Sequence, residues 1–318
     1  MNSKLQSILD KEKIMVIDGS MSTALENMGL DLNDPLWTAI ALANEPDKVR
    51  QVHYNYFKAG ADCSISCSYQ ATIPGFMNKG YSEAEAEKLI RRSAEMLLEA
   101  RSDFMAKEAG PDRLEPLALA GIGPYGAYLA DGSEYTGNYG VSDSVLKDFH
   151  RRRMEIMAEA GCDILLIETQ PSLKEAVLAA EIAEDIGIDF WVSFSCKDGK
   201  HIHEGELIAD CAKELSAFPH INMIGVNCVP PVFVNSLIYE LKSASDIPVA
   251  CYPNSGETYH ADTKTWSGSG MTKSYKDMAL EWMRSGAVAV GGCCRTVEKH
   301  VEQVVEARKQ FCKYPVIR

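Results

Sequence analysis

Three cysteines in the second half of the chain stand where thiols could hold a metal ion. Cys293 and Cys294 are adjacent in AVGGCCRT (289–296), and Cys228 follows the apolar run of residues 222–227. Adjacent Cα atoms lie about 3.8 Å apart, whereas an ordinary disulfide needs roughly 4.4–6.8 Å, so the adjacent pair is unsuited to bridging itself. Three thiolates can bind Zn²⁺ and leave a fourth position open for chemistry. Spacing alone leaves three buried thiols as an equal alternative, because no Cys-x-x-Cys pair is present.

Two acidic residues occupy similar positions elsewhere in the chain. Asp18 ends the run IMVID, and Glu168 ends the run DILLIE. Paired carboxylates can perform acid–base work or hold an ammonium group. The competing interpretation for each acid alone is a solvated strand end or a helix N-cap.

The elements that must position these side chains are eight short apolar runs separated by amphipathic helical stretches. Most runs are continuous, which is typical of parallel strands buried on both faces. Several helical stretches end in a glycine before the next run, as in KAGAD, EAGCD and RSGAV. The runs cover residues 14–18, 61–66, 116–121, 163–168, 189–195, 222–227, 247–252 and 287–292.

Eight strand–helix units of roughly 40 residues predict an α/β fold, a (β/α)₈ TIM barrel that forms one domain over residues 1–318. A doubly wound open sheet is the alternative, and the lack of a clear edge strand favours the barrel. Because TIM-barrel chemistry occurs at the C-terminal strand ends, we expect the acids and thiols to converge there. Ser68, Asn227 and Asn254 end other strands and join the candidate face.

Three further patterns are interpreted as structural. GIGPYG (121–126) matches a dinucleotide fingerprint in letters, but Pro124 lies inside it and no acid-terminated second strand follows at the required distance, so we expect a loop over the barrel mouth. Lys197 in KDGK is expected in an exposed turn. His201 and His203 in HIHEG are expected in a surface loop, because no third metal ligand is near them in sequence.

Composition limits the classes of function. The 318 residues carry a net charge of −13, which argues against a nucleic-acid or anionic-membrane surface, and no apolar run is long enough for a transmembrane helix. The N-terminus lacks the apolar core of a signal peptide. The ten cysteines are therefore expected to be reduced, in a cytoplasmic protein. Cys162, Cys211 and Cys312 are expected to be small buried hydrophobes, and no role is assigned to Cys67, Cys196 or Cys251.

Five motifs in order, DGSMSTALE, YGAYLADGSEYTGNYG, GVNC, YPNSGE and GGCCRT, resemble the homocysteine S-methyltransferase family over about residues 12–310. The second motif resembles the branch that uses S-methylmethionine. The resemblance implies a homocysteine-binding barrel with a catalytic zinc ion on Cys228, Cys293 and Cys294. It further implies that homocysteine is bound by Asp18 and Glu168, with Ser68 (often Thr in relatives) and Asn254 also in the substrate site.

The implied reaction is methyl transfer from a sulfonium donor to the thiolate of L-homocysteine, giving methionine. The partners are then small molecules alone. The motif after residue 124 contains Tyr125, Tyr128, Tyr135 and Tyr139, whose rings could attract an onium cation or simply pack the loop. We expect S-methylmethionine to be a better donor than S-adenosylmethionine. The alternatives are a betaine-dependent homocysteine methyltransferase and a non-catalytic zinc-binding barrel.

Overall fold

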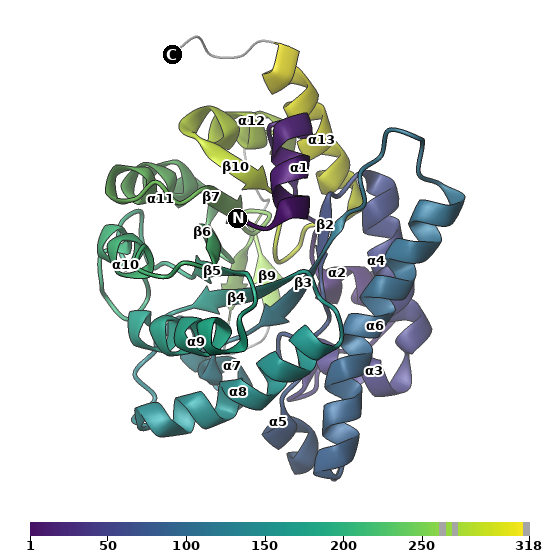
Figure 1. The fold of residues 1–318 in the computed structure, drawn as a ribbon, viewed down its shortest axis with the longest axis vertical. Helices are drawn as coiled ribbons and strands as arrows, with labels where there is room; N and C mark the ends of the chain where they lie inside the picture. The colour runs from purple at the N-terminus through teal and green to yellow at the C-terminus, as the bar shows by residue number, and fades with distance from the viewer. Residues whose placement is uncertain (261–264, 269–272, 314–318) are drawn as a thin grey trace.

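The fold is built around one eight-stranded parallel sheet curled into a barrel with helices outside it (Figure 1). This computed structural model describes residues 1–260, 265–268 and 273–313. The strand order is β1-β10-β7-β6-β5-β4-β3-β2. The strands are β1 (Met15–Val16), β2 (Cys63–Ile65), β3 (Leu117–Ile122), β4 (Ile164–Gln170), β5 (Phe190–Phe194), β6 (Ile221–Asn227), β7 (Val249–Tyr252) and β10 (Ala287–Val290). Each predicted run overlaps one of them, so the (β/α)₈ prediction is confirmed and the open sheet is wrong.

The helices cover the outside of the barrel between successive strands (Figure 1). Their caps follow the sequence signals: Ser82 and Glu85 form a capping box at the start of α6, and Gly60, Gly187 and Gly286 end helices in the left-handed conformation. The α-helices are α1 (Ser3–Glu12), α2 (Met21–Asn27), α3 (Ala41–Asn44), α4 (Pro46–Ala59), α5 (Ile73–Asn78), α6 (Glu83–Lys107), α7 (Tyr125–Leu129), α8 (Asp143–Glu159), α9 (Leu173–Ile186), α10 (Ile208–Leu215), α11 (Pro231–Ala244), α12 (Tyr275–Ser285) and α13 (Glu298–Lys313). Short 3₁₀ helices are η1 (Trp37–Ile40) and η2 (Ser133–Tyr135).

The barrel closes where β1 meets β2, and side chains make much of this seam. The backbone N–H of Asp62 donates to Val16 O (2.7 Å), and the Asp62 carboxylate accepts from Val16 N (2.8 Å). Nearer the mouth, Asp18 Oδ2 accepts from Ile65 N (2.9 Å). Two aspartates therefore supply hydrogen bonds that a regular ladder supplies elsewhere in the sheet.

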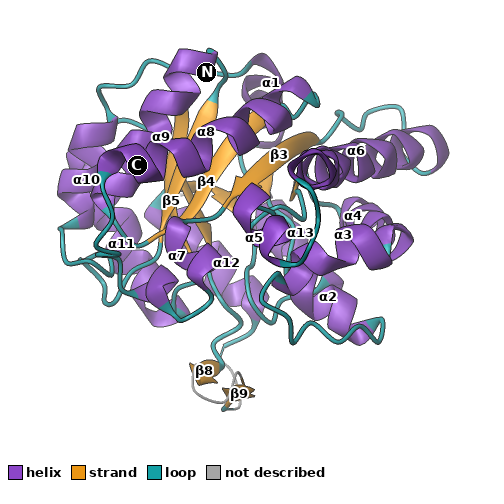
Figure 2. Ribbon diagram, turned by 90° about the horizontal axis from the view of Figure 1, so that it is seen from below, coloured by secondary structure: helices purple, strands orange, loops and turns teal. Residues whose placement is uncertain are grey.

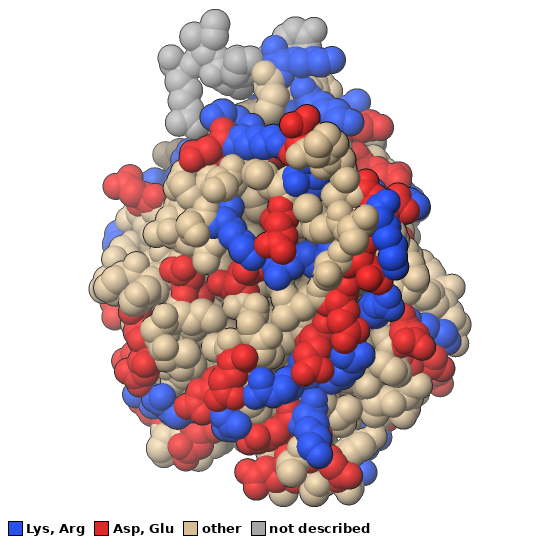
Figure 3. Space-filling model, turned by 45° about the vertical axis from the view of Figure 1, so that its right-hand side comes forward, with Lys and Arg blue, Asp and Glu red and all other residues tan. Residues whose placement is uncertain are grey.

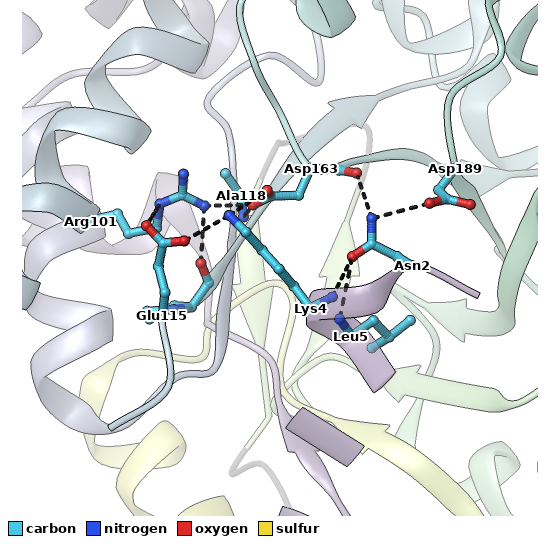
Figure 4. A network of polar contacts seen from close by, with 9 residues as sticks. Asn2, Lys4, Leu5, Arg101, Glu115, Ala118, Asp163 and Asp189 are labelled. Atoms are coloured by element: carbon cyan, nitrogen blue, oxygen red, sulfur yellow. Dashed lines mark hydrogen bonds and ion pairs between the residues drawn. The ribbon is translucent and has the colours of Figure 1, made fainter. Parts of the chain in front are cut away.

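Helix α1 closes the end of the barrel at which the strands begin. Leu5 and Ile8 are buried and join the apolar cluster that alternate strand residues form inside the barrel. Polar contacts fix the start of the helix (Figure 4): Asn2 Nδ2 donates to Asp189 (3.1 Å), and Lys4 pairs with Asp163 (2.9 Å). Figure 2 shows α1 at one end of the barrel, while a two-stranded hairpin, β8 (Thr258–His260) and β9 (Thr265–Ser267), projects from the opposite end.

Two surface properties bear on the class of protein. On the face shown in Figure 3, Lys and Arg side chains are interspersed with Asp and Glu. None of the helices in the described part of the chain combines the length and apolar composition that a membrane span requires.

All ten cysteines are free. Cys162 and Cys211 are buried, as predicted, but the prediction for Cys312 is wrong. Cys312 is exposed because it lies in the last turn of the terminal helix α13, where little of the chain packs over it.

Candidate active site

The three candidate thiols meet at the C-terminal ends of β6 and β10. Their sulfur atoms all lie within 4.8 Å of one another, and Cys228 Sγ is 3.6 Å from Cys294 Sγ. Four ligands placed tetrahedrally at the Zn–S distance of about 2.3 Å would be about 3.8 Å apart. The three sulfurs of Cys228, Cys293 and Cys294 therefore fit three corners of a zinc tetrahedron.

The backbone that presents the cysteine pair requires the two glycines before it. Gly291 passes so close to β1 that a Cβ there would lie 2.5 Å from Ile17 Cβ. Gly292 N then donates to Asp18 O (3.1 Å), and Cys293 N donates to Pro253 O (2.8 Å). These contacts fix the turn that aims both thiols into the mouth.

The three thiols share negative charge unequally. Hydrogen bonds from the Cys293 and Cys294 thiols lower the pKa of Cys228 well below its usual range. The hydrogen bond to Cys228 in turn raises the pKa of each of the other two thiols. Without a metal, the three cysteines thus favour a single thiolate on Cys228 and two protonated thiols. Ionising the other two requires added positive charge, which a divalent metal ion supplies.

Asp18 and Glu168 lie at the same mouth, and both are buried. Burial raises the pKa of Asp18 to about 7. Burial also raises the pKa of Glu168 to about 8, with the charges of Asp18 and Cys228 adding to the effect. Neither acid forms an ion pair with any residue that the structure describes, and Asp18 Oδ1 is buried without a hydrogen-bond partner. Two buried acids with spare oxygens make a site suited to a cation.

Ser68 and Asn254 hold different places in this site. Ser68 Oγ donates to Gly121 O (2.7 Å), so its hydroxyl fixes the end of β3. Asn254 lies beside the thiols, where its side-chain hydrogen bond helps to lower the pKa of Cys228. Asn254 Oδ1 is buried without a partner, so this amide retains a free acceptor at the mouth.

Gly121 offers a test of how closely Glu168 must be placed. A Cβ at this position would lie 2.8 Å from Glu168 Oε1 and 3.0 Å from an Ile65 methyl group. Gly121→Ala is therefore expected to displace the Glu168 carboxylate and raise the KM for the substrate that this acid binds roughly tenfold, equivalent to about 1.4 kcal/mol. The capacity of the three thiols to hold a metal should be unchanged. Gly110→Ala is the matched control, because a Cβ there meets nothing within 4 Å. Equal KM values for the two variants would contradict this placement.

The four tyrosines predicted near the mouth divide into two groups. Tyr125 packs against Tyr128 and Tyr139, with ring centroids 5.6 and 5.5 Å away, and against Phe149 at 5.0 Å. These rings fasten the segment to the barrel. Tyr135 differs, since its hydroxyl lies 3.3 Å from Cys228 Sγ. The segment is also not purely a loop: it contains the short helices α7 and η2, although it carries no dinucleotide-type helix.

Glu175 anchors the mouth segment that contains Tyr125 and Tyr139. This fully buried acid on α9 accepts hydrogen bonds from Tyr139 Oη (2.9 Å) and from Tyr125 N (2.5 Å). His150 Nε2 lies 2.8 Å from the same carboxylate. The segment that carries Tyr135 is therefore tied to two helices of the barrel wall.

Near the mouth, the sequence prediction was wrong for His203 and gave Asn227 no specific role. His203, expected on the surface, is half-buried, because the chain after β5 folds back and His203 N donates to Ser195 O (3.2 Å). Its ring lies 5.6 Å from that of Tyr135. Lys197 is exposed, as predicted. Asn227 accepts from Thr169 N (2.9 Å) and so joins the ends of β6 and β4; its position before Cys228 in GVNC was the available signal.

The fold and site together define a (β/α)₈ barrel with a thiol cluster and two unpaired acids at its catalytic end. A sequence profile described as homocysteine S-methyltransferase matches residues 15–308. The chain is 47% identical over 302 residues to the homocysteine S-methyltransferase YbgG of Bacillus subtilis, covering 94% of this chain and 96% of that protein. It is 44% identical over 298 residues to the selenocysteine methyltransferase of Astragalus bisulcatus, covering 88% of each.

The structural comparison agrees with the sequence comparisons. The homocysteine methyltransferase MmuM from Escherichia coli, in its metallated form, matches with a TM-score of 0.86 at 35% identity, over 95% of this chain and 99% of that one. The chain therefore belongs to the homocysteine S-methyltransferase family, and it is an enzyme of methyl transfer.

Proposed function

We propose that this enzyme uses zinc, held by Cys228, Cys293 and Cys294, to transfer a methyl group from S-methylmethionine to L-homocysteine. S-Adenosylmethionine is proposed as a weaker donor. The observation that carries the proposal is the meeting of three sulfurs within 4.8 Å at the mouth of the barrel. The existence of a metallated form of the related MmuM supports a metal in this enzyme.

A metal held by the three cysteines would lower the pKa of the homocysteine thiol, because the thiolate and not the thiol is the nucleophile. The protein's own contribution begins with orientation. Asp18 and Glu168 would hold the substrate ammonium group and direct its sulfur toward the cysteines. Their burial strengthens this contact, since few water molecules compete for the carboxylates there.

The charge of the site favours a positively charged donor. Three cysteine sulfurs meet at the mouth, Glu168 is close enough to Asp18 and Cys228 to feel their charges, and a sulfonium carries one positive charge. In the transfer, a sulfur lone pair of homocysteine forms the new S–CH₃ bond while the donor C–S bond breaks. The electron pair of the breaking bond returns to the sulfonium sulfur. From S-methylmethionine, both products are therefore methionine, and opposite charges are neutralised together in a buried site.

The donor assignment leads to a direct test. With homocysteine as acceptor, we expect kcat/KM for S-methylmethionine to exceed that for S-adenosylmethionine by about tenfold or more, equivalent to about 1.4 kcal/mol, because the latter also requires space for adenosine. Glycine betaine should give no methionine. Initial rates for all three donors would be measured at one pH and one salt concentration with zinc-loaded protein. A betaine rate equal to that of S-methylmethionine would overturn the assignment in favour of the betaine-dependent alternative.

Two other expectations concern the non-catalytic alternative and the cellular compartment. The non-catalytic zinc barrel is no longer a candidate, because the family and its relatives are methyltransferases. We propose a reducing compartment such as the cytoplasm, and ten free thiols in one chain support this proposal.

A further inference from the structure

Behind Asp18 lies a short chain of buried polar groups that the reaction described above does not use. Ser64 Oγ, on β2, donates to Asp18 Oδ2 at 2.6 Å. His53 Nδ1, on α4, lies 2.8 Å from the same Ser64 oxygen. His53 and Ser64 are both fully buried, so neither ring nor hydroxyl is hydrogen-bonded to bulk water. The segment that follows β1, the strand β2 and the helix α4 thus contribute one polar group each.

The hydrogen bonds fix where the protons must be. Ser64 has a single hydroxyl proton, and it points to the Asp18 carboxylate. The Ser64 oxygen can then only accept from His53, so His53 must carry its proton on Nδ1. His53 Nε2 is buried without a partner, which suits an unprotonated nitrogen better than an N–H. Burial also lowers the pKa of His53 to about 3, which keeps the ring neutral.

We propose that His53 and Ser64 are positioning residues that fix the Asp18 carboxylate for the ammonium group of the amino-acid thiol. This inference rests on the function proposed above for Asp18. We call the hydrogen-bonded pair His53 and Ser64 the relay. Together with Ile65 N at 2.9 Å, the relay holds Asp18 Oδ2 and leaves Asp18 Oδ1 without a partner at the mouth. One oxygen is thereby fixed in the barrel wall, and the other is directed to substrate.

The relay also favours the charged form of Asp18. Burial disfavours this charge, and the hydrogen bonds from Ser64 and Ile65 oppose that effect. Because His53 donates to Ser64, the Ser64 hydroxyl is kept pointing at Asp18 instead of rotating away. Loss of either member should therefore weaken ammonium binding without touching the thiol cluster.

The test compares two acceptors, homocysteine and 4-mercaptobutanoate, which is homocysteine without its amino group. Ser64→Ala and His53→Leu are expected to raise the KM for homocysteine about tenfold with kcat nearly constant. The KM for 4-mercaptobutanoate should remain unchanged, and zinc should stay at one per chain. His53→Asn should restore most of the affinity lost in His53→Leu, because its smaller side chain places an N–H donor at nearly the position of Nδ1.

Each other outcome counts against a definite claim. Equal increases in KM for both acceptors would show a purely structural role and overturn the relay. An unchanged homocysteine KM in Ser64→Ala and His53→Leu, alongside a raised KM in Asp18→Asn, would overturn the relay and leave the role of Asp18 intact. An unchanged KM in Asp18→Asn would instead overturn the proposed ammonium site. If His53→Leu fails to fold, Ser64→Ala alone decides, since it removes a single oxygen atom.

Discussion

Replacing any one of Cys228, Cys293 or Cys294 by serine is expected to remove most of the bound zinc and to lower kcat/KM at least about a thousandfold, roughly 4 kcal/mol. A serine hydroxyl remains protonated near neutral pH, so the site would keep only two thiolates for the ion. Metal content per chain and methionine formation would be measured on the same preparations. The wild-type protein should hold about one zinc ion.

The matched control for this experiment is Cys312→Ser. Cys312 is exposed at the end of α13 and is not part of the thiol cluster, so zinc and activity should both be retained. Circular dichroism would establish that the cluster variants remain folded. Full activity in any one of the three cluster variants would refute the three-thiolate site.

Asp18→Asn and Glu168→Gln are expected to raise the KM for homocysteine about thirtyfold to a hundredfold, because each removes a buried charge partner worth about 2–3 kcal/mol. Both substitutions keep an oxygen that can accept the existing hydrogen bonds from Ile65 N and Tyr252 Oη. Barrel closure should therefore survive. KM and kcat would be measured with homocysteine and with 4-mercaptobutanoate.

The second acceptor separates charge recognition from general damage. Because 4-mercaptobutanoate has no ammonium group, it should be a poor substrate for the wild-type protein. The two variants should use it with about the same KM as the wild-type protein does. Zinc content should be unchanged, since neither acid is a ligand in the proposed site. Wild-type protein that accepts 4-mercaptobutanoate as readily as homocysteine would show that the two acids do not bind an ammonium group.

The sequence predicted the barrel and its strand ends because each strand is marked by residues that are close together in the chain. Continuous apolar runs and helix-ending glycines located all eight strands, and a TIM barrel brings every strand end to one face. Asp18, Glu168 and Cys228 could thus be assigned to one mouth before their distances were known. That neither acid has an ion-pair partner among the described residues could not be predicted in the same way, because pairing depends on side chains far apart in sequence.

The segments between the strands were harder to interpret, since no periodicity encodes the path of a loop. Tyr135 could not be separated from Tyr125, although only Tyr135 contacts a thiol. His203 was misplaced for the same reason: a backbone hydrogen bond to Ser195 turns the segment inward. The link between His53 and Ser64 joins a helix to the following strand, and its geometry depends on the packing of α4 against the barrel.

The seam between β1 and β2 links ligand binding to the stability of the closed barrel. Asp18 joins the two strands with one oxygen and, in the proposed function, binds substrate with the other. A ligand that binds only the closed barrel stabilises it by RT ln(1 + [L]/Kd), about 2.7 kcal/mol at a hundredfold excess over Kd. Bound homocysteine would then stabilise the contact between β1 and β2 that closes the barrel. Amide protons such as that of Ile65 should therefore exchange more slowly with solvent when the site is filled.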